Sequence, residues 1–208
     1  MHYTLSELIL EVIQNAIESE AGIIIADILE TPEELNVYVA DNGKGMSEDK
    51  LSQIRDPYFT DGIKHEKRKV GLGIPFLAQT LSMTDGKFDI TSEPEKGTSL
   101  FAKFNLQHID TPPMGDVIGL FTQALCFWGS YELVINRKYT KEEEEQGYSL
   151  IRSELMEALG GSLEDSDSII MLKKYITSQE EDISKGGNHG KDEPRRIKKT
   201  SGRKEESN

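Results

Sequence analysis

The chain has a single cysteine among its 208 residues, which excludes an intrachain disulfide and a metal cluster built from several cysteines. That residue, Cys126, lies in an apolar stretch, and we expect it to be a buried, unreactive thiol. No run approaches the roughly 18 apolar residues that a membrane span needs. No basic region precedes an apolar one at the N-terminus. We therefore expect no membrane segment, no signal peptide and a cytoplasmic protein.

Positive charge is also scarce, except near the C-terminus. The formal net charge is −13, yet residues 184–208 hold eight lysines and arginines against four acidic residues, so the rest of the chain carries −17. Nucleic-acid binding needs clustered cations, so an acidic body argues against nucleic acid as the main ligand. The composition of residues 184–208, rich in Gly, Ser and Lys, predicts a disordered basic tail.

Residues 4–19 show the periodicity of an amphipathic helix, with apolar residues at spacings of three and four. Thr4 followed by Glu7 forms a capping box, which predicts where this helix begins. Glu11 and Asn15 are four residues apart at the edge of the apolar stripe, so their side chains lie on the same side of the helix. Both are available either to a ligand lying over the helix or to a structural hydrogen bond.

Two short β-branched segments, residues 22–29 and 35–40, are joined by a polar turn and predict an antiparallel pair of strands. The second segment ends in Asp41, and a loop with two closely spaced glycines, Gly43 and Gly45, follows at once. Glycine removes the Cβ where a backbone turns sharply or approaches a ligand closely. The pattern Asp-x-Gly-x-Gly is a weak signal alone, since it also fits a tight turn after a strand.

A brief helix capped by Ser47 is expected over residues 48–55, and a cation-rich stretch without periodicity follows over residues 58–69. This stretch runs into a second glycine pair just before a predicted helix at residues 75–82. Backbone N–H groups and the positive end of a helix dipole can meet an anion at such a point. A charge run in isolation is more often a solvated loop, but beside this glycine pair we predict a mobile lid that covers phosphate groups.

Residues 87–92 and 98–106 alternate apolar and polar side chains around a turn that contains Pro and Gly, which predicts a hairpin. The order of elements is then helix, two strands, loop, short helix, lid, helix and two strands. This order predicts an α+β fold, a sandwich in which one mixed, mostly antiparallel sheet carries helices on one face.

Four short motifs occur in a fixed order along this stretch. They are Glu11-x-x-x-Asn15-Ala16, Asp41-x-Gly43-x-Gly45-Met46, Phe59-Thr60 ahead of Gly71-x-Gly73, and Gly97-Thr98. Together they resemble the Bergerat ATP-binding fold, an α/β sandwich shared by gyrase, the heat-shock chaperone, histidine kinases, MutL and anti-sigma serine kinases. The resemblance covers about residues 5–106, half of the chain, and implies that ATP and Mg²⁺ are the cofactors.

The resemblance also implies a role for each motif residue. Asp41 would accept a hydrogen bond from the adenine amine, and Thr98 would support the same site. Asn15 would hold Mg²⁺ through its amide oxygen, and Glu11 would be the catalytic general base. The residues that would contact the cofactor are Asn15, Asp41, Gly43, Gly45, Met46, Phe59, Lys64, Gly71, Leu72, Gly73 and Thr98.

Glu11 departs from one branch of the superfamily. Hydrolytic members and anti-sigma serine kinases carry a carboxylate at this place, whereas typical histidine kinases carry an amide. A histidine kinase also has a phosphoacceptor histidine on a dimerisation helix ahead of this domain, but here only 14 residues precede Asn15, and His2 is their sole histidine. We therefore expect a stand-alone ATP-binding subunit that acts on a partner protein, rather than a self-contained two-component sensor.

Beyond about residue 108 the pattern changes. This predicts an ATP-binding domain at residues 1–107, a small α/β or mostly helical region of unknown role at 108–183, and the tail at 184–208. The elements expected in the middle region are an apolar helix at 115–127, a strand at 131–139, an acidic helix at 142–159 and an amphipathic helix from about 167. The region shows no catalytic pattern, and it either packs against the ATP-binding domain or binds a partner.

Three functions remain open at this point. The chain phosphorylates a partner protein as anti-sigma serine kinases do, or it is a slow ATPase whose nucleotide state a partner senses, or it is a non-catalytic nucleotide-binding sensor or scaffold. Glu11 favours the first two, because a module that only binds nucleotide needs no carboxylate beside the metal site. Gyrase-like and MutL-like relatives dimerise on ATP, so a homodimer stays open, although the arms that mediate it are not visible in the sequence.

Overall fold

The computed structural model describes residues 4–55 and 73–184. The helices are α1 (Leu5–Glu18), α2 (Glu48–Arg55), α3 (Gly73–Met83), α4 (Val117–Cys126), α5 (Arg152–Ala158) and α6 (Ser166–Ser184). The strands are β1 (Ile23–Glu30), β2 (Glu34–Asp41), β3 (Lys87–Glu93), β4 (Gly97–Asn105), β5 (Glu132–Lys141) and β6 (Glu144–Ile151). Within the described residues, no helix has both the length and the apolar character that crossing a membrane requires.

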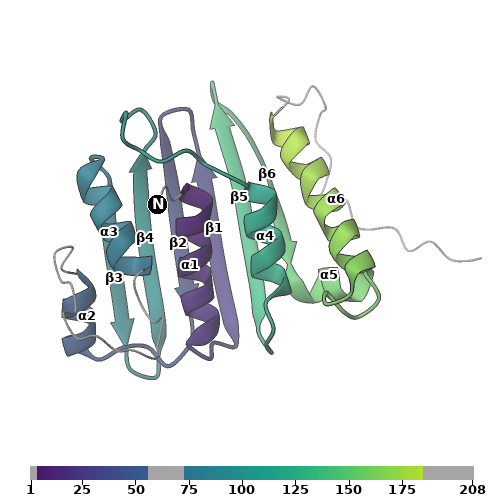
Figure 1. The fold of residues 1–208 in the computed structure, drawn as a ribbon, viewed down its shortest axis with the longest axis horizontal. Helices are drawn as coiled ribbons and strands as arrows, with labels where there is room; N and C mark the ends of the chain where they lie inside the picture. Colours follow the sequence, from purple (N-terminus) through teal and green to yellow (C-terminus); the bar gives the residue numbers. More distant parts are fainter. Residues whose placement is uncertain (1–3, 56–72, 185–208) are drawn as a thin grey trace, which may run out of the picture.

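The six strands form one sheet in the order β3-β4-β2-β1-β5-β6, and α1, α3, α4 and α6 lie over one of its faces (Figure 1). The sheet is mixed, because β1 runs parallel to β5 while every other pair is antiparallel. The predicted α+β sandwich is therefore confirmed.

The first helix begins as its sequence predicts. Thr4 Oγ1 accepts a hydrogen bond from Glu7 N, and the Glu7 carboxylate accepts one from Thr4 N at 2.7 Å. These bonds satisfy backbone N–H groups that the start of a helix leaves without partners. The apolar stripe of α1, which includes Leu8 and Ile13, is buried in the core. Glu11, at the edge of that stripe, is exposed.

Strand β2 delivers Asp41 to the helix-covered side of the sheet. Leu35, Val37 and Val39 alternate along β2 and are buried beneath the helices. Asp41 has the same parity, so its side chain emerges on that side, where the strand ends. In the antiparallel register with β4, Asp41 stands opposite Thr98.

The second half of the chain extends the same sheet. β5 pairs with β1 in parallel, from Ile23 opposite Glu132 to Glu30 opposite Tyr139, and β6 closes the edge as an antiparallel partner of β5. The predicted boundary near residue 108 lies between β4 and α4, and both the sheet and the hydrophobic core continue across it. The region after that boundary thus packs against the first half.

The prediction of an acidic helix at residues 142–159 is wrong for its first part, which forms strand β6; helix α5 begins only at Arg152. The run of four glutamates favours a helix by intrinsic propensity. At the turn before β6, however, Glu142 and Glu143 have φ angles of 53° and 71°. Such turns usually carry Asn or Gly, because other residues rarely adopt positive φ, so the sequence held no turn signal.

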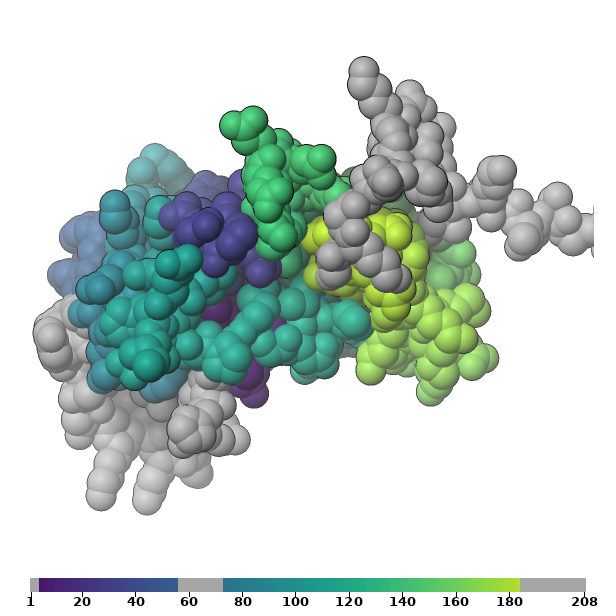
Figure 2. Space-filling model, turned by 90° about the horizontal axis from the view of Figure 1, so that it is seen from above, coloured from purple at the N-terminus to yellow at the C-terminus, as the bar shows by residue number. Residues whose placement is uncertain are grey.

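A buried ionic cluster ties α6 to the sheet. Arg137 of β5, with a side chain only 4% exposed, donates to Glu30 at the end of β1 and, through Nε, to Glu180 of α6 at 3.3 Å. Tyr148 of β6 also donates to Glu180 Oε1, at 2.6 Å. Burial and this acidic neighbour raise the pKa of Tyr148. Seen from above, this end of the molecule shows the β5–β6 turn beside the β1–β2 turn and α6 (Figure 2).

Candidate functional site

The predicted site residues within the described ranges gather around α1. They are Glu11 and Asn15 of α1, Asp41 at the end of β2 with the glycine loop that follows it, Gly73 at the start of α3, and Thr98 near the start of β4. Helix α1 contacts both α3 and β2 (Figure 1). Residues that lie far apart in the sequence are thus brought to one region on the helix-covered face.

Asp41 is half-buried, and two donors converge on one of its oxygens. Oδ1 accepts hydrogen bonds from Gly43 N at 2.8 Å and from Ser19 Oγ at 3.1 Å. Burial raises the pKa of the Asp41 carboxyl above its ordinary value, while these two donors and the backbone N–H of Thr98 lower it. The result is a well-oriented hydrogen-bond acceptor in a partly dry site, which suits recognition of an exocyclic amine.

The glycines of the Asp41 loop are required by contacts within the protein. A methyl group on Gly43 would lie 1.9 Å from Ser19 Oγ, and one on Gly45 would lie 1.9 Å from the carbonyl oxygen of Glu93. Gly45 also has a φ of 61°, which favours glycine. The loop is therefore wedged between the end of α1 and the β3–β4 turn. That Gly43 and Gly45 also contact the cofactor stays a prediction.

Gly97 and Thr98, at the start of β4, lie next to Asp41 on the neighbouring strand. A methyl group on Gly97, whose φ is 105°, would lie 1.9 Å from the Asp41 carbonyl oxygen, so the two strand ends approach each other closely. Thr98 is half-buried, and its Oγ1 lies 2.9 Å from Ser92 Oγ in a hydrogen bond. The Thr98 hydroxyl is thus held in place next to the strand end that carries Asp41.

Glu11 of α1 and Gly73 of α3 also lie close together in this region. A methyl group on Gly73 would lie 3.0 Å from both Cβ and Oε2 of Glu11. The carboxylate therefore lies against the first residue of α3, where the positive end of the helix dipole is. Asn15, one turn further along α1, is half-buried, and its backbone oxygen accepts a hydrogen bond from Ser19 N at 3.0 Å.

The remaining predicted contacts fall into two groups. Met46 is half-buried and packs against the hydrophobic core. Phe59, Lys64, Gly71 and Leu72, together with the predicted lid, lie outside the described residues.

Sequence reasoning missed Ser19, the helix-ending residue that bonds to Asp41. The one signal that could have found it is its place four residues after Asn15, one turn further along α1.

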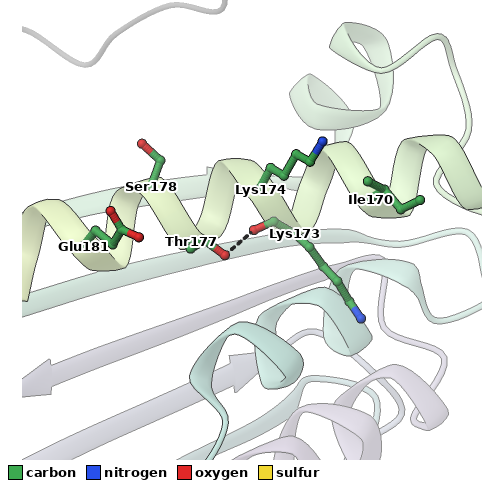
Figure 3. A pocket seen from close by; sticks show the side chains of 6 residues that line it. All are labelled: Ile170, Lys173, Lys174, Thr177, Ser178 and Glu181. Atoms are coloured by element: carbon green, nitrogen blue, oxygen red, sulfur yellow. Dashed lines mark hydrogen bonds between the residues drawn. The ribbon is translucent and has the colours of Figure 1, made fainter.

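A shallow hollow on α6 is a separate feature. Figure 3 shows its lining side chains, all from one face of that helix: Ile170, Lys173, Lys174, Thr177, Ser178 and Glu181. Thr177 Oγ1 donates to the Lys173 carbonyl at 2.8 Å, so this hydroxyl serves the helix itself. None of the predicted site residues that the structure describes lines the hollow, and α4 lies between α6 and α1 (Figure 1).

Comparison with known proteins identifies relatives that match part of the chain. Sporulation kinase C of Bacillus subtilis is 30% identical over 96 residues, which are 45% of this chain and 22% of that protein. Sensor histidine kinase RcsC of Salmonella typhimurium is 27% identical over 127 residues, 60% of this chain and 13% of that protein. The chain thus spans less than a quarter of these two curated relatives.

Among solved structures, the N-terminal domain of a DNA repair protein has a TM-score of 0.45 at 10% identity, covering 80% of this chain and 58% of that one. At this TM-score and identity, the likeness does not establish a shared fold.

A family match accounts for the first half of the chain. Residues 2–108 match the family described as "Histidine kinase-, DNA gyrase B-, and HSP90-like ATPase". The matched range is half of the chain and contains all four motifs that the sequence analysis identified. The chain therefore belongs to the family of histidine kinase-, DNA gyrase B- and HSP90-like ATPases, with an ATP-binding domain at residues 2–108.

Proposed function

We propose that this chain binds Mg-ATP beside α1 and that Glu11 promotes attack on the γ-phosphate. The attacking group is water in a slow ATPase, or a hydroxyl of a partner protein in a kinase. Both reactions need the same machinery from the chain: a base that deprotonates and orients the nucleophile, and groups that hold the phosphates in line. The proposal covers both, and the choice between them depends on the partner.

The contact between Glu11 and Gly73 carries the proposal. It places a carboxylate at the start of α3, where backbone N–H groups and the helix dipole attract an anion such as phosphate. A carboxylate beside bound phosphate weakens binding by charge repulsion. A carboxylate at this position is explained if it acts as a general base. The contact therefore argues against a protein that only binds nucleotide.

Asp41 would read the adenine end of the nucleotide. Its Oδ1 accepts hydrogen bonds from Gly43 N and Ser19 Oγ, and Oδ2 would accept one from the adenine amine. Thr98, opposite Asp41 in the register, would support that bond through its held hydroxyl. Such a site discriminates strongly against a nucleobase that has no hydrogen-bond donor at this position, since the partly buried Asp41 carboxylate would then lack a partner.

Asn15 would hold Mg²⁺ through its amide oxygen. The described residues contain no group of three or more His, Cys, Asp and Glu side chains that could hold a metal ion. A magnesium ion that arrives with ATP does not need such a group, because phosphate oxygens and water supply most of its ligands. A half-buried amide one helical turn from Glu11 fits that requirement.

Incubation with γ-labelled Mg-ATP, alone and with a cell extract, tests the proposal. Wild-type protein should release labelled phosphate or label a protein in the extract, and Glu11→Ala should bind ATP but do neither. Glu18→Ala removes another exposed carboxylate of α1 and should behave as wild type. Labelling of one extract protein would make the chain a kinase, and phosphate release alone would make it an ATPase. ATP binding with neither signal would refute the catalytic proposal and leave a sensor or scaffold.

A further inference from the structure

Ser19 is the residue that joins the end of α1 to the loop carrying Asp41. Its Oγ lies 3.1 Å from Asp41 Oδ1 and 2.8 Å from the carbonyl oxygen of Ala16. Its backbone oxygen accepts a hydrogen bond from Lys44 N at 3.0 Å. The same residue thus contacts the loop through both its side chain and its backbone.

Gly43 packs onto Ser19 so closely that no larger residue fits. A methyl group on Gly43 would lie 1.9 Å from Ser19 Oγ and 2.7 Å from its backbone oxygen. Backbone contacts of this kind leave the loop little freedom relative to α1. The position of the Asp41 carboxylate is therefore fixed relative to Asn15, whose carbonyl accepts a hydrogen bond from Ser19 N.

The Ser19 hydroxyl has one hydrogen and two acceptors within reach, Ala16 O and Asp41 Oδ1. When it donates to Asp41, it joins Gly43 N on Oδ1 and orients the carboxylate so that Oδ2 is the oxygen presented to a ligand donor. Donation to Oδ1 also lowers the pKa of Asp41, against the burial that raises it. Both effects favour the ionised acceptor.

We propose that Ser19 is a positioning residue for nucleotide recognition, which makes Asp41 selective for a purine that carries a 6-amino group. The inference rests on the proposed function, because it takes Asp41 as the residue that reads the base. It goes further in assigning part of the base selectivity to a hydroxyl at the end of α1, outside the four motifs. Ser19 acts through Asp41 and does not itself touch the nucleotide.

The test compares two nucleotides that differ only in the group that Asp41 would read. Dissociation constants are measured for Mg-ATP and for the triphosphate of purine riboside, which lacks the 6-amino group. Wild type should prefer ATP. Ser19→Ala should lower that preference about fivefold, by weakening ATP binding alone, which is the size of a typical net hydrogen-bond contribution. Ser19→Thr, which keeps the hydroxyl, should restore the preference.

Ser6→Ala is the matched control, because Ser6 Oγ donates to Met114 O at 2.6 Å near the other end of α1. It should leave the preference unchanged. If Ser19→Ala binds both nucleotides more weakly by the same factor, or retains the full preference for ATP, the role proposed for Ser19 is wrong, while the proposed function still stands. Wild type that binds neither nucleotide would overturn the proposed function as well. In a protein that already carries Asp41→Asn, Ser19→Ala should not change the ratio of the two dissociation constants any further. An additional change in that ratio would contradict the proposal that Ser19 acts through Asp41.

Discussion

The carboxylate of Glu11, in the middle of α1, lies against Gly73, the first residue of α3, so closely that a methyl group on Gly73 would be 3.0 Å from Glu11 Oε2. The two residues are 62 positions apart, and the contact between α1 and α3 brings them together. It links the residue proposed as general base to the helix start proposed to bind phosphate. Any substitution that fills this space should therefore act on turnover first.

Gly73→Ala tests that contact. The added methyl group must displace the Glu11 side chain by a few tenths of an ångström or more, so we expect turnover to fall about tenfold, as for a general base moved out of line. The fold should remain intact, because alanine favours a helix more than glycine does. Phosphate release and thermal unfolding are the measurements.

Gly22→Ala is the control for this substitution, because its methyl group would meet Asn42 only at an ordinary 3.9 Å. It should leave turnover as in wild type. Full turnover in Gly73→Ala would show that the position of Glu11 does not matter for the reaction.

Asp41→Asn should separate stability from binding. Burial raises the folded pKa of Asp41 above its ordinary value of 3.8, so the folded state holds this proton more tightly than the unfolded state does. The contribution of Asp41 to stability therefore falls as the pH rises from about 4 through the folded pKa. The variant, which has no charge to bury, should melt no lower than wild type at pH 7.

The difference in melting temperature between this variant and wild type should shrink as the pH approaches 4, because wild type then carries a neutral carboxyl. Calorimetry at a series of pH values measures it, and other titrating groups cancel in the comparison. A variant that melts well below wild type at pH 7 would mean that the Asp41 charge stabilises the fold.

Arg137→Met should destabilise the protein strongly. Substitution removes a cation whose side chain is 4% exposed and leaves the carboxylates of Glu30 and Glu180, 20% and 17% exposed, without it. Breaking a buried pair in this way costs about 3 kcal/mol of unfolding free energy. Urea denaturation followed by circular dichroism measures the loss.

Its neighbour provides the control. Lys138 pairs with Glu145 at 2.9 Å, but both side chains are about half exposed, at 46% and 55%. Lys138→Met should therefore cost less than about 1 kcal/mol. Equal losses in the two variants would contradict the structural role given to the buried cluster.

Much of the first half could be predicted because its signals are local. The capping box of Thr4 and Glu7 fixed the start of α1, and alternation in residues 35–40 and 98–106 predicted β2 and β4. The motif order then identified the family. Local patterns could not show that β1 pairs in parallel with β5, since that pairing joins residues more than a hundred positions apart.

The features that the sequence could not predict have equally specific causes. The sequence of β6 predicts a helix because glutamates dominate its start and its turn lacks Asn or Gly, but tertiary pairing with β5 overrides that propensity. By sequence, the glycines of the Asp41 loop fit either a sharp turn or a close approach to a ligand, and the structure shows Ser19 and Glu93 where their Cβ atoms would lie. A glycine in the sequence indicates that a side chain does not fit at that position, but it does not show which neighbouring residue leaves no room for one.

Titration of wild type and Asp41→Asn with Mg-ATP in a calorimeter decides whether Asp41 binds the base of the nucleotide. Wild type should bind ATP, and Asp41→Asn, though folded, should lose at least about tenfold in affinity, since an amide would place a donor opposite the adenine amine. Equal affinity in the two proteins would contradict the assignment of Asp41 as the residue that reads the base, and with it the position of the nucleotide beside α1.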